Sequence, residues 1–355
     1  MSHQVSYHHL LMEMISIPAT SRNEKERSDF LEKYLRGIGY VVTRIHNNLL
    51  VGDLDADDTR PRILLNSHLD TVSPVEGWQT DPFHPLLKGE KIIGLGSNDA
   101  GASVVTMIAS YVSVYPEVRN HINLMLLISA EEEISGSHGI TSTLEFLGEL
   151  DGVIVGEPTG MKPAVAERGL MVLDGEIRGM AGHAARNEGQ NAIYLAMKDI
   201  DSIGKMVFPK PSKWLPGPGA QVTMISAGTS HNVVPDLCRY VVDVRSNDIY
   251  GNETMLDSIR SLCNATLTPR STRLKPSSLD EGNLLMETIN KCGFKPFGSS
   301  TLSDMALIPF PAMKMGPGDS ARSHTAGEFI MTKELDEGIE LYCRFLRTMK
   351  EIIKH

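Results

Sequence analysis

Short apolar runs alternate with longer apolar or amphipathic stretches in the first part of the chain. Residues 102–115 are long enough for a helix, and residues 24–36 carry apolar side chains at helical spacing before two glycines. Ser21 and Glu24 have the spacing of a capping box, which predicts how that helix begins. Shorter, strand-like runs cover residues 40–45, 63–65, 123–129 and 152–156. Strands that alternate with helices predict an α/β layer with a buried, largely parallel sheet.

The pattern changes after about residue 166. Apolar runs at 169–179, 221–228 and 233–246 predict strands, and those at 191–203 and 253–265 predict helices. This β-α-β-β-α order fits a small antiparallel sheet with helices on one face.

A polar segment rich in proline, serine and charge, residues 266–283, ends this second region. The α/β pattern then returns, and the last helix keeps its apolar residues on one face: Leu335, Ile339, Tyr342, Leu346, Met349 and Ile353. We therefore expect a second domain inserted into the first. The expected division is 1–166 and 275–355 for the first domain and 167–274 for the inserted one.

Length and charge narrow the class of protein. The chain has 355 residues, which fits two domains of the typical ~150 residues. Its net charge of −10 disfavours nucleic acid and anionic membranes as partners, because both attract cationic surfaces. The sequence contains neither a secretory signal nor a run of the ~20 apolar residues that a membrane span needs, so we expect a cytoplasmic protein. The four cysteines are scattered, with no pair spaced for a zinc ribbon or a redox motif.

In four places an apolar, strand-like run ends in residues that commonly bind metals. These places are residues 62–70, 124–133, 153–158 and 311–324, and they carry His68, Asp70, Glu131, Glu132, Glu133, Glu157 and His324. The carboxyl ends of strands in an open α/β sheet meet at one edge, so these side chains are expected to converge there. Asp99 lies just before the long apolar helix and can join them.

Each of these residues also has a simpler explanation when taken alone. A single aspartate before a helix, such as Asp99, is more often an N-cap than a ligand. His68 or His324 alone would more often be a hydrogen-bonded loop residue, and a run of glutamates is usually a solvated cluster at a helix start. Their joint placement after apolar strands makes a shared site the better interpretation.

Eight short motifs follow one another along nearly the whole chain: SHLDTVSP, GLGSNDAGA, SAEEEISG, VGEPTG, GMAGHAARNEGQNAI, SHNVVPD, VDVRS and GPGDSARSHTAGEF. In this order they resemble a metallopeptidase family that includes acetylornithine deacetylase, succinyl-diaminopimelate desuccinylase, aminoacylase and glutamate carboxypeptidase. VGEPTG and GPGDSARSH are most similar to the acetylornithine deacetylase branch. The resemblance implies a three-layer α/β/α zinc-peptidase-like catalytic domain with an inserted ferredoxin-like α+β dimerisation domain.

The resemblance also implies two divalent metal ions. His68, Asp99 and Glu157 would hold one ion, and Asp99, Glu133 and His324 the other. Histidine and carboxylate ligands without cysteine suit zinc, with cobalt or manganese as substitutes.

A catalytic carboxylate is implied next to these ligands. The resemblance makes Glu132 the base, and Asp70 the residue that orients His68. A shift of register by one residue would instead make Glu131 the base and Glu132 a ligand. The family pattern has an acidic residue before the catalytic glutamate, and Glu131 occupies that place, which favours Glu132 as the base and Glu133 as the ligand.

Further residues of the site are implied in the inserted domain and near the C-terminus. His183 resembles a histidine that reaches across a homodimer to stabilise the developing oxyanion, and Asn232 and Arg245 resemble substrate contacts. The sequence allows equally that Arg245 is an ordinary strand-surface arginine. Gly318 would pass close to the ligand as backbone, and Ser303 is a further candidate contact.

Three departures from the family affect the choice of substrate and none affects the ligands. The lysine that many members have two residues after the bridging aspartate is replaced by Gly101. Ala-Ala-Arg-Asn replaces a common Ser-Ser-x-Pro run after His183, and the usual paired glycines before Ser303 are lacking.

The expected function is therefore removal of an acetyl or succinyl group from an amino acid such as acetylornithine or acetylcitrulline, in arginine or lysine biosynthesis. Arg322 favours an acidic acyl tail or is a surface residue. A metal-dependent di- or tripeptidase is the alternative within enzymes, because the same metal pair cleaves any amide that its pocket admits. A metal-binding or assembly protein without turnover is the alternative outside them.

Overall fold

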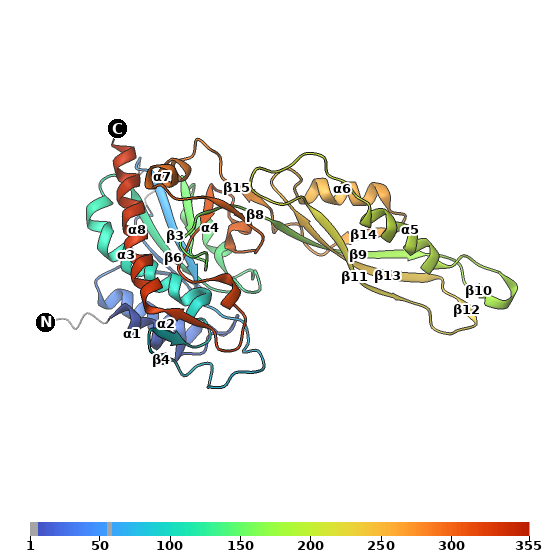
Figure 1. Cartoon of the computed structure of the whole chain (residues 1–355), viewed down its shortest axis with the longest axis horizontal. Helices are drawn as coiled ribbons and strands as arrows, with labels where there is room; N and C mark the ends of the chain where they lie inside the picture. Colours follow the sequence, from blue (N-terminus) through green and yellow to red (C-terminus); the bar gives the residue numbers. More distant parts are fainter. Residues whose placement is uncertain (1–5, 55–58, 355) are drawn as a thin grey trace. The chain divides into compact units, whose positions relative to one another are not determined.

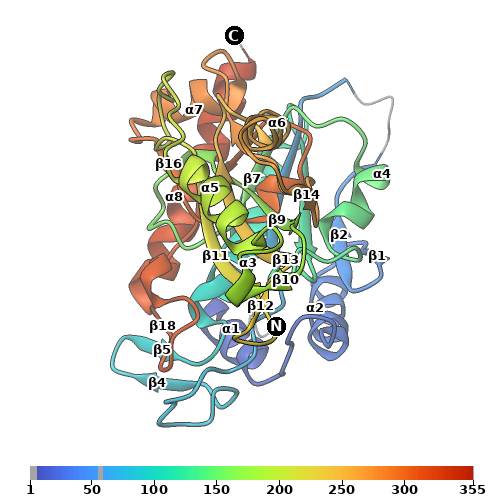
Figure 2. The same ribbon diagram turned by 90° about the vertical axis from the view of Figure 1, so that its right-hand side faces the viewer.

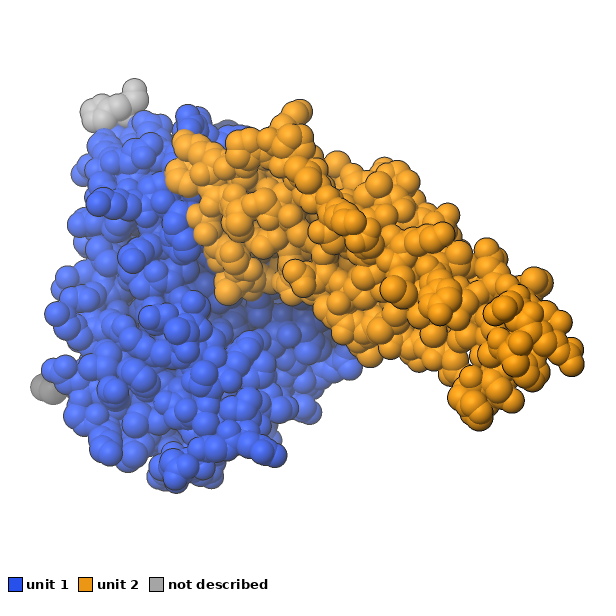
Figure 3. Space-filling model, turned by 45° about the vertical axis from the view of Figure 1, so that its right-hand side comes forward, with its two compact units in different colours: residues 1–165, 279–297, 303–355 blue, residues 166–278, 298–302 orange. Residues whose placement is uncertain are grey.

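The chain forms two compact units, shown in different colours in Figure 3. The computed structural model describes residues 6–54 and 59–354. The first unit comprises residues 1–165, 279–297 and 303–355, and the second comprises residues 166–278 and 298–302. The domain division expected from the sequence stays a prediction. In the described part of the chain, no helix is both long and apolar enough to span a bilayer.

The strands that lead to the candidate site belong to a nine-stranded mixed sheet. Its strands are β1 (Thr43–Ile45), β2 (Asn48–Val51), β3 (Arg62–His68), β6 (Asn123–Ser129), β7 (Gly152–Val155), β8 (Ala164–Glu167), β15 (Ser277–Ser278), β16 (Phe297–Ser299) and β17 (Ala312–Lys314). Their order is β1-β2-β6-β3-β7-β17-β8-β15, with β16 beside β8. The four strands β6, β3, β7 and β17 are parallel to one another, and β1, β2, β8 and β15 pair antiparallel. The largely parallel sheet predicted from the sequence is thus confirmed for its centre.

Helices cover both faces of this sheet, which explains its continuous apolar strands. Every residue of β3 and β6 is buried, as expected for parallel strands with covered faces. The helices α3 (Ala102–Val118), α7 (Leu284–Cys292) and α8 (Thr332–Ile353) pack together on one side (Figure 1). Leu64, Met125 and Val153 face the other side, where they pack against Ile140 and Leu147 of a short 3-10 turn and of α4 (Leu144–Leu147).

Two helices precede the sheet, α1 (Tyr7–Ile15) and α2 (Lys25–Gly37). The helix predicted at 24–36 is confirmed, but its predicted capping box is wrong. The Ser21 hydroxyl donates to Asp70 at 2.7 Å, and Glu24 accepts from the backbone N–H of Arg22. At the start of α8, Glu334 accepts from the backbone N–H of Met331 at 2.9 Å. A small sheet of β18 (Phe329–Met331), β5 (Lys91–Ile93) and β4 (Leu86–Lys88) lies nearby in the same unit.

The second unit is built on a four-stranded antiparallel sheet. In chain order its elements are β9 (Gly169–Arg178), α5 (Ala192–Gly204), β11 (Gly219–Ala227), β13 (Leu237–Ser246), α6 (Asn252–Leu262) and β14 (Thr266–Pro269). The strand order β11-β13-β9-β14 is that of a ferredoxin-like sheet. β14 was not predicted, because its four residues lie in the segment interpreted as a polar linker. Together with the nine-stranded mixed sheet, this topology confirms the predicted α/β fold class.

Both helices of the second unit pack on one face of its sheet (Figures 1 and 2). Alternate residues of β13 are buried, as its pleat requires: Cys238, Tyr240, Val242 and Val244. Helix α5 covers them with Ala192, Ala196 and Ile203, and α6 adds Met255 and Ile259. Beyond this sheet, a two-residue pairing joins β10 (Gly182–His183) to β12 (Val233–Val234).

Candidate metal centre

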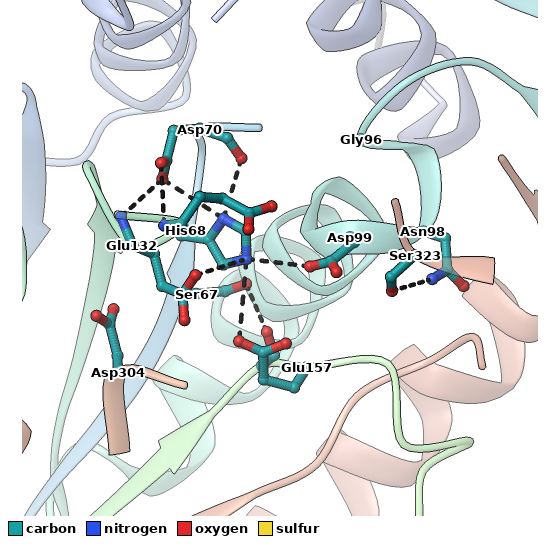
Figure 4. A network of polar contacts seen from close by, with 12 residues as sticks. Ser67, His68, Asp70, Gly96, Asn98, Asp99, Glu132, Glu157, Asp304 and Ser323 are labelled. Atoms are coloured by element: carbon teal, nitrogen blue, oxygen red, sulfur yellow. Dashed lines mark hydrogen bonds and ion pairs between the residues drawn. The ribbon is translucent and has the colours of Figure 1, made fainter. Parts of the chain in front are cut away.

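Three parallel strands of the first unit end in a common group of polar side chains. His68 is the last residue of β3, Glu132 and Glu133 follow β6, and Glu157 follows β7. Figure 4 shows the side chains of His68, Asp99, Glu132 and Glu157 directed toward one another. The topology that parallel pairing imposes therefore brings these ligand types to one edge of the sheet.

His68 lies at the centre of the first set of contacts. Its Nε2 atom is 3.2 Å from Asp99 Oδ1, 3.9 Å from Glu157 Oε1 and 4.0 Å from Glu132 Oε2. The His68 side chain is only 2% exposed, while the three carboxylates each keep 12% of their surface. One imidazole nitrogen thus faces three carboxylates across gaps that a cation can fill.

His324 completes the group from the segment that follows β17. Its Nε2 atom lies 3.0 Å from Glu133 Oε2 and 3.7 Å from Asp99 Oδ2. Asp99 is therefore the carboxylate between the two histidines, with one oxygen toward each. Ligand atoms within 4.8 Å of one another form two sets, His68 with Asp99 and Glu133, and His68 with Glu132 and Glu157.

Asp99 does not act as a simple helix cap. Helix α3 begins at Ala102 with Gly101 as its N-cap, without a side-chain capping bond in the described structure. The Asp99 carboxylate instead contacts His68 and His324. Its backbone lies in a non-helical kink at φ −118° and ψ 102°, which turns the side chain away from the helix axis.

The three consecutive glutamates diverge. The Glu131 carboxylate accepts from the backbone N–H of His138 at 3.2 Å and lies 3.6 Å from the His138 Nδ1 atom, away from the group around His68. Glu131 has a positive φ of 52°, which separates its direction from that of its neighbours. Glu132 and Glu133 face the two histidines instead. This geometry favours the register in which Glu132 is the base and Glu133 the ligand.

Asp70 contacts His68 through both its backbone carbonyl and its carboxylate. The His68 Nδ1 atom lies 3.0 Å from the Asp70 carbonyl oxygen and 3.5 Å from its carboxylate. That carboxylate accepts from the backbone N–H groups of Glu132 at 3.1 Å and Glu133 at 3.3 Å, and from the Ser21 hydroxyl. Burial alone would raise the pKa of Asp70, but these bonds and the contact with His68 outweigh it and lower the pKa. Asp70 therefore fixes both the imidazole and the turn that carries the glutamates.

The group carries more negative than positive charge. Burial, together with the neighbouring carboxylates, raises the pKa of Glu132 well above its ordinary value and that of Glu157 to about 8. Burial would lower the pKa of His68, yet the surrounding carboxylates hold it well above the ordinary value. The hydrogen bond to Glu133 raises the pKa of His324 to about 9. In the absence of metal, bound protons thus compensate the excess negative charge of the carboxylates, and bound cations would compensate it in their place.

These residues fit a pair of divalent cations. Glu157 Oε1 is buried and has no hydrogen-bond partner among residues 6–54 and 59–354, and a buried carboxylate oxygen of this kind needs a proton or a metal. The ligand set of imidazole and carboxylate is the one that zinc, cobalt and manganese bind.

Asp304 belongs to the surroundings of the group and was not singled out in the sequence. It is buried, and its Oδ2 atom accepts from Asn66 Nδ2 at 3.0 Å and Ser129 Oγ at 2.8 Å, at the ends of β3 and β6. Burial raises its pKa to about 6. It follows Ser303 in the chain, so the Ser-Asp pair at 303–304 was the available signal. Ser303 itself is buried and accepts from the backbone N–H of Met305.

The C-terminal candidates take different places. Gly318 has φ +90°, a conformation that favours glycine, and a β-carbon there would collide with the Asn98 amide. Gly318 thus lies against Asn98, the neighbour of Asp99, and its closeness to a bound ligand stays a prediction. Arg322 forms a bidentate ion pair with Glu334 at 2.7 and 3.1 Å, and its guanidinium lies over the Phe329 ring. The Arg322 guanidinium is therefore already paired with a carboxylate of this chain.

The candidates of the inserted region lie in the second unit. His183 in β10 is exposed, and its neighbour Ala184 donates to the Asn232 carbonyl at 3.1 Å, so the segments of His183 and Asn232 lie side by side. The Arg245 guanidinium is held by both oxygens of Asp243 at 2.7 and 3.0 Å. Within its own unit, Arg245 has the character of a paired strand-surface residue.

A group of two histidines and four carboxylates beyond the parallel central strands of a mixed sheet fits a metal-dependent hydrolase. Residues 64–348 match peptidase family M20/M25/M40, and the chain belongs to this family. It is accordingly a hydrolase that acts on amide bonds.

Some similar proteins are named as desuccinylases and others as peptidases. A succinyl-diaminopimelate desuccinylase of Pelagibacter ubique is 28% identical over 71% of this chain and 71% of its own length. An M20 peptidase domain-containing protein of Schizosaccharomyces pombe is 27% identical over 96% of this chain and 84% of its own.

Solved structures share the fold. Aminopeptidase PepT from Bacillus cereus superposes with a TM-score of 0.76 at 21% identity, covering 97% of this chain and 98% of the other. The YxeP protein of Bacillus subtilis, described as a dinuclear metal-binding M20 peptidase, gives 0.72 at 16% identity, covering 98% and 99%.

Proposed function

We propose that this chain is a two-metal amidohydrolase that removes an acyl group from the nitrogen of an amino acid. The observation that carries the proposal is the convergence of His68, Asp99, Glu133, Glu157 and His324 from separate segments, with two histidines on either side of Asp99. The two cations would be held by His68, Asp99 and Glu157 and by Asp99, Glu133 and His324. Zinc is the proposed ion, with cobalt or manganese as substitutes.

In this mechanism Glu132 is the general base. When bound, the ions polarise the substrate carbonyl and make water a better nucleophile at neutral pH. Glu132 takes a proton from the attacking water and returns it to the departing nitrogen. Asp70 holds the backbone of Glu132 and the His68 ring in place, as the bonds at 3.1 and 3.0 Å support. The mechanism needs no covalent attachment of the acyl group to the protein.

The acyl group is proposed to be acetyl or succinyl, on an amino acid of arginine or lysine biosynthesis. Lysine biosynthesis is supported by relatives named succinyl-diaminopimelate desuccinylase. Because Arg322 is paired with Glu334, it gives no support to recognition of an acidic acyl tail. N-acetylornithine and N-acetylcitrulline are therefore proposed as substrates beside the succinylated amino acids. A cytoplasmic location stays a prediction from the sequence.

The test is a direct comparison of hydrolysis rates. Acetylated and succinylated ornithine, citrulline and diaminopimelate are assayed together with di- and tripeptides, with and without added Zn²⁺, Co²⁺ or Mn²⁺. A kcat/KM at least about 10²-fold higher for one acyl amino acid than for the peptides supports the proposal, since a well-fitted polar pocket discriminates by that much or more.

A di- or tripeptidase is the second candidate function. It is favoured by the fold shared with proteins named as an aminopeptidase and a tripeptidase. Preference for peptides in the same assay selects it. Absence of hydrolysis of every amide, with both ions bound, would instead favour a metal-binding or assembly protein.

We further propose a homodimer formed through the second unit. β11 pairs with β13 on one side and, among the described strands, has no partner on the other. Its Met224 and Ile225 side chains are 64% and 53% exposed, and Tyr194 and Met197 of α5 are 66% and 57% exposed. An open strand edge with exposed apolar residues is a common surface for pairing with a second copy. In such a dimer, His183 would serve the site of the partner subunit, and analytical ultracentrifugation tests the association.

A further inference from the structure

One buried glutamate outside the ligand set joins two segments that carry ligands. Glu328 lies four residues after His324 and is only 1% exposed. Its Oε1 atom accepts from the backbone N–H groups of Asn98 at 2.8 Å and Asp99 at 2.9 Å, and its Oε2 atom accepts from Gly96 at 3.1 Å. A single carboxylate from the C-terminal part of the chain therefore holds the loop that presents Asp99.

Asn98 forms a second connection between the same two segments. Its side-chain oxygen accepts from the backbone N–H of Asp319 at 3.0 Å, and its amide nitrogen donates to the Asp319 carbonyl at 3.1 Å and to Ser323 Oγ at 3.3 Å. Figure 4 shows Asn98 and Ser323 beside Asp99. Residues 96–99 are thus tied to the C-terminal segment on both sides of His324, by Asp319 and Ser323 before it and by Glu328 after it.

The Asp99 loop depends on these contacts because regular secondary structure does not hold it. Asp99 lies in a kink before α3, and the Gly96 conformation, at φ 77°, is one that side chains rarely adopt. A β-carbon at Gly96 would lie 2.6 Å from a Thr71 methyl group and 3.7 Å from Arg27 Nη1. The loop is therefore closely packed, and the three N–H groups that Glu328 accepts would lose their partner without it.

A buried cation accompanies Glu328. Arg27 of α2 is 2% exposed, and its Nη1 atom donates to the Leu69 carbonyl at 2.8 Å, between His68 and Asp70. Its other nitrogens donate to the Ile17 carbonyl at 3.0 and 2.7 Å. Burial lowers the pKa of Arg27 to about 10, and the nearby carboxylates of Asp70 and, to a lesser degree, Glu328 oppose that shift. Burial raises the pKa of Glu328 to about 7, and the backbone N–H groups of Asp99, Asn98 and Gly96 favour its charged form.

We propose that Glu328 is a positioning residue that couples the Asp99 loop to the His324 segment, so that both side chains reach the same cation. The inference rests on the metal pair of the proposed function. Asp99 and His324 come from segments more than 220 residues apart in the chain, so their approach to within 3.7 Å depends on contacts between those two segments. Glu328 provides such a contact through its three backbone hydrogen bonds to residues 96, 98 and 99, without being one of the proposed ligands.

The experiment compares Mn²⁺ binding by the metal-free full-length protein and its variants. Isothermal titration calorimetry gives the number and affinity of the ions, and electron paramagnetic resonance detects the spin coupling of two ions bridged by one carboxylate. We expect Glu328→Ala to weaken one of the two ions by about 10- to 100-fold, the range found when partners of ligands are removed, and to lose the coupled signal. Glu328→Gln should give a smaller loss, because its one carbonyl oxygen can still accept from Asn98 and Asp99.

Glu334→Gln is the matched control. Glu334 also accepts a backbone N–H and pairs with an arginine in the same C-terminal region, but it contacts residues 322 and 331 and not the Asp99 loop. We expect it to bind both ions with the wild-type affinity and the coupled signal. Circular dichroism of each metal-free variant verifies the fold.

The possible outcomes separate the two proposals. If wild-type protein binds no coupled pair of Mn²⁺ ions, the proposed metal centre is wrong. If the wild type binds the pair and folded Glu328→Ala binds it equally well, the role of Glu328 is wrong while the metal centre stands. Should Glu328→Ala fail to fold, Glu328→Gln decides: an unchanged second ion and unchanged coupling overturn the proposal, and a weakened second ion supports it.

Discussion

Replacement of Glu132 by glutamine tests the proposed chemistry most directly. Glutamine has nearly the shape of glutamate, and the Glu132 side chain is 12% exposed with its carboxylate 4.0 Å from the His68 imidazole. The change therefore removes a proton acceptor and a negative charge with little disturbance of packing. His68, Asp99, Glu133, Glu157 and His324 all remain, so the variant should still bind both ions.

The size of the effect follows from the role of the group. A positioned general base contributes typically ~10²–10⁴ in rate. Each factor of ten corresponds to ~1.4 kcal/mol in the activation barrier, so the loss amounts to roughly 3–6 kcal/mol. Removal of one charge from a crowded group of carboxylates also reduces their mutual repulsion, which gives no reason for the fold to weaken.

The assay measures kcat, KM and metal content on the best substrate of the acyl amino acid panel. Glu131→Gln is the matched control, because its carboxylate lies against His138 and should leave turnover near the wild-type value. Glu133→Gln should instead lose metal, since Glu133 is 3.0 Å from the ligand His324. Turnover of Glu132→Gln above about half of wild type, or a large loss in Glu131→Gln, would refute the assigned register.

Three further predictions follow from the same contacts. Metal-free protein should lose thermal stability as the pH rises between about 5 and 9. Glu157 (pKa about 8) and His324 (pKa about 9) keep protons in the folded state that the unfolded chain has already released at these pH values. Melting curves recorded after metal removal test this, and a melting temperature that stays constant or rises with pH contradicts it. Asp199→Ala should lower the free energy of unfolding by about 3 kcal/mol, because the buried carboxylate accepts from the backbone N–H groups of Asn264 and Ala265 and from the Tyr240 hydroxyl. Urea titration measures this free energy, and a decrease of less than ~1 kcal/mol contradicts the prediction. His183→Ala should lower kcat by about 10²-fold with unchanged metal content, and normal activity in a monomeric enzyme would remove His183 from the mechanism.

Local pattern was a good guide to the elements that form the centre of the sheet. The run at 123–129 and that at 152–156 become β6 and β7 almost residue for residue, because buried parallel strands are apolar on both faces. The same physics located the candidate ligands, since polar residues that interrupt such runs lie where the strands end. The long apolar stretch at 102–115 likewise became α3.

The sequence was less informative about very short strands and about side chains whose hydrogen-bond partner lies far away in the chain. β14 was missed because its four residues are stabilised by pairing with β9 and carry little apolar pattern of their own. The capping box at Ser21 failed because the same hydroxyl has a stronger acceptor in Asp70, which is 49 residues away in the chain. A local motif cannot reveal a partner that only the fold brings near.

The order of apolar runs and ligand-type residues by itself determined the α/β class, predicted an inserted second region, and identified the histidines and carboxylates that can bind metal. Only the tertiary structure decided which glutamate of the run faces His68, that Arg322 is already paired, and that Asp304 and Glu328 support the group. The physical reason is that side-chain direction and hydrogen-bond partners depend on contacts between segments up to about 230 residues apart, which no local pattern encodes.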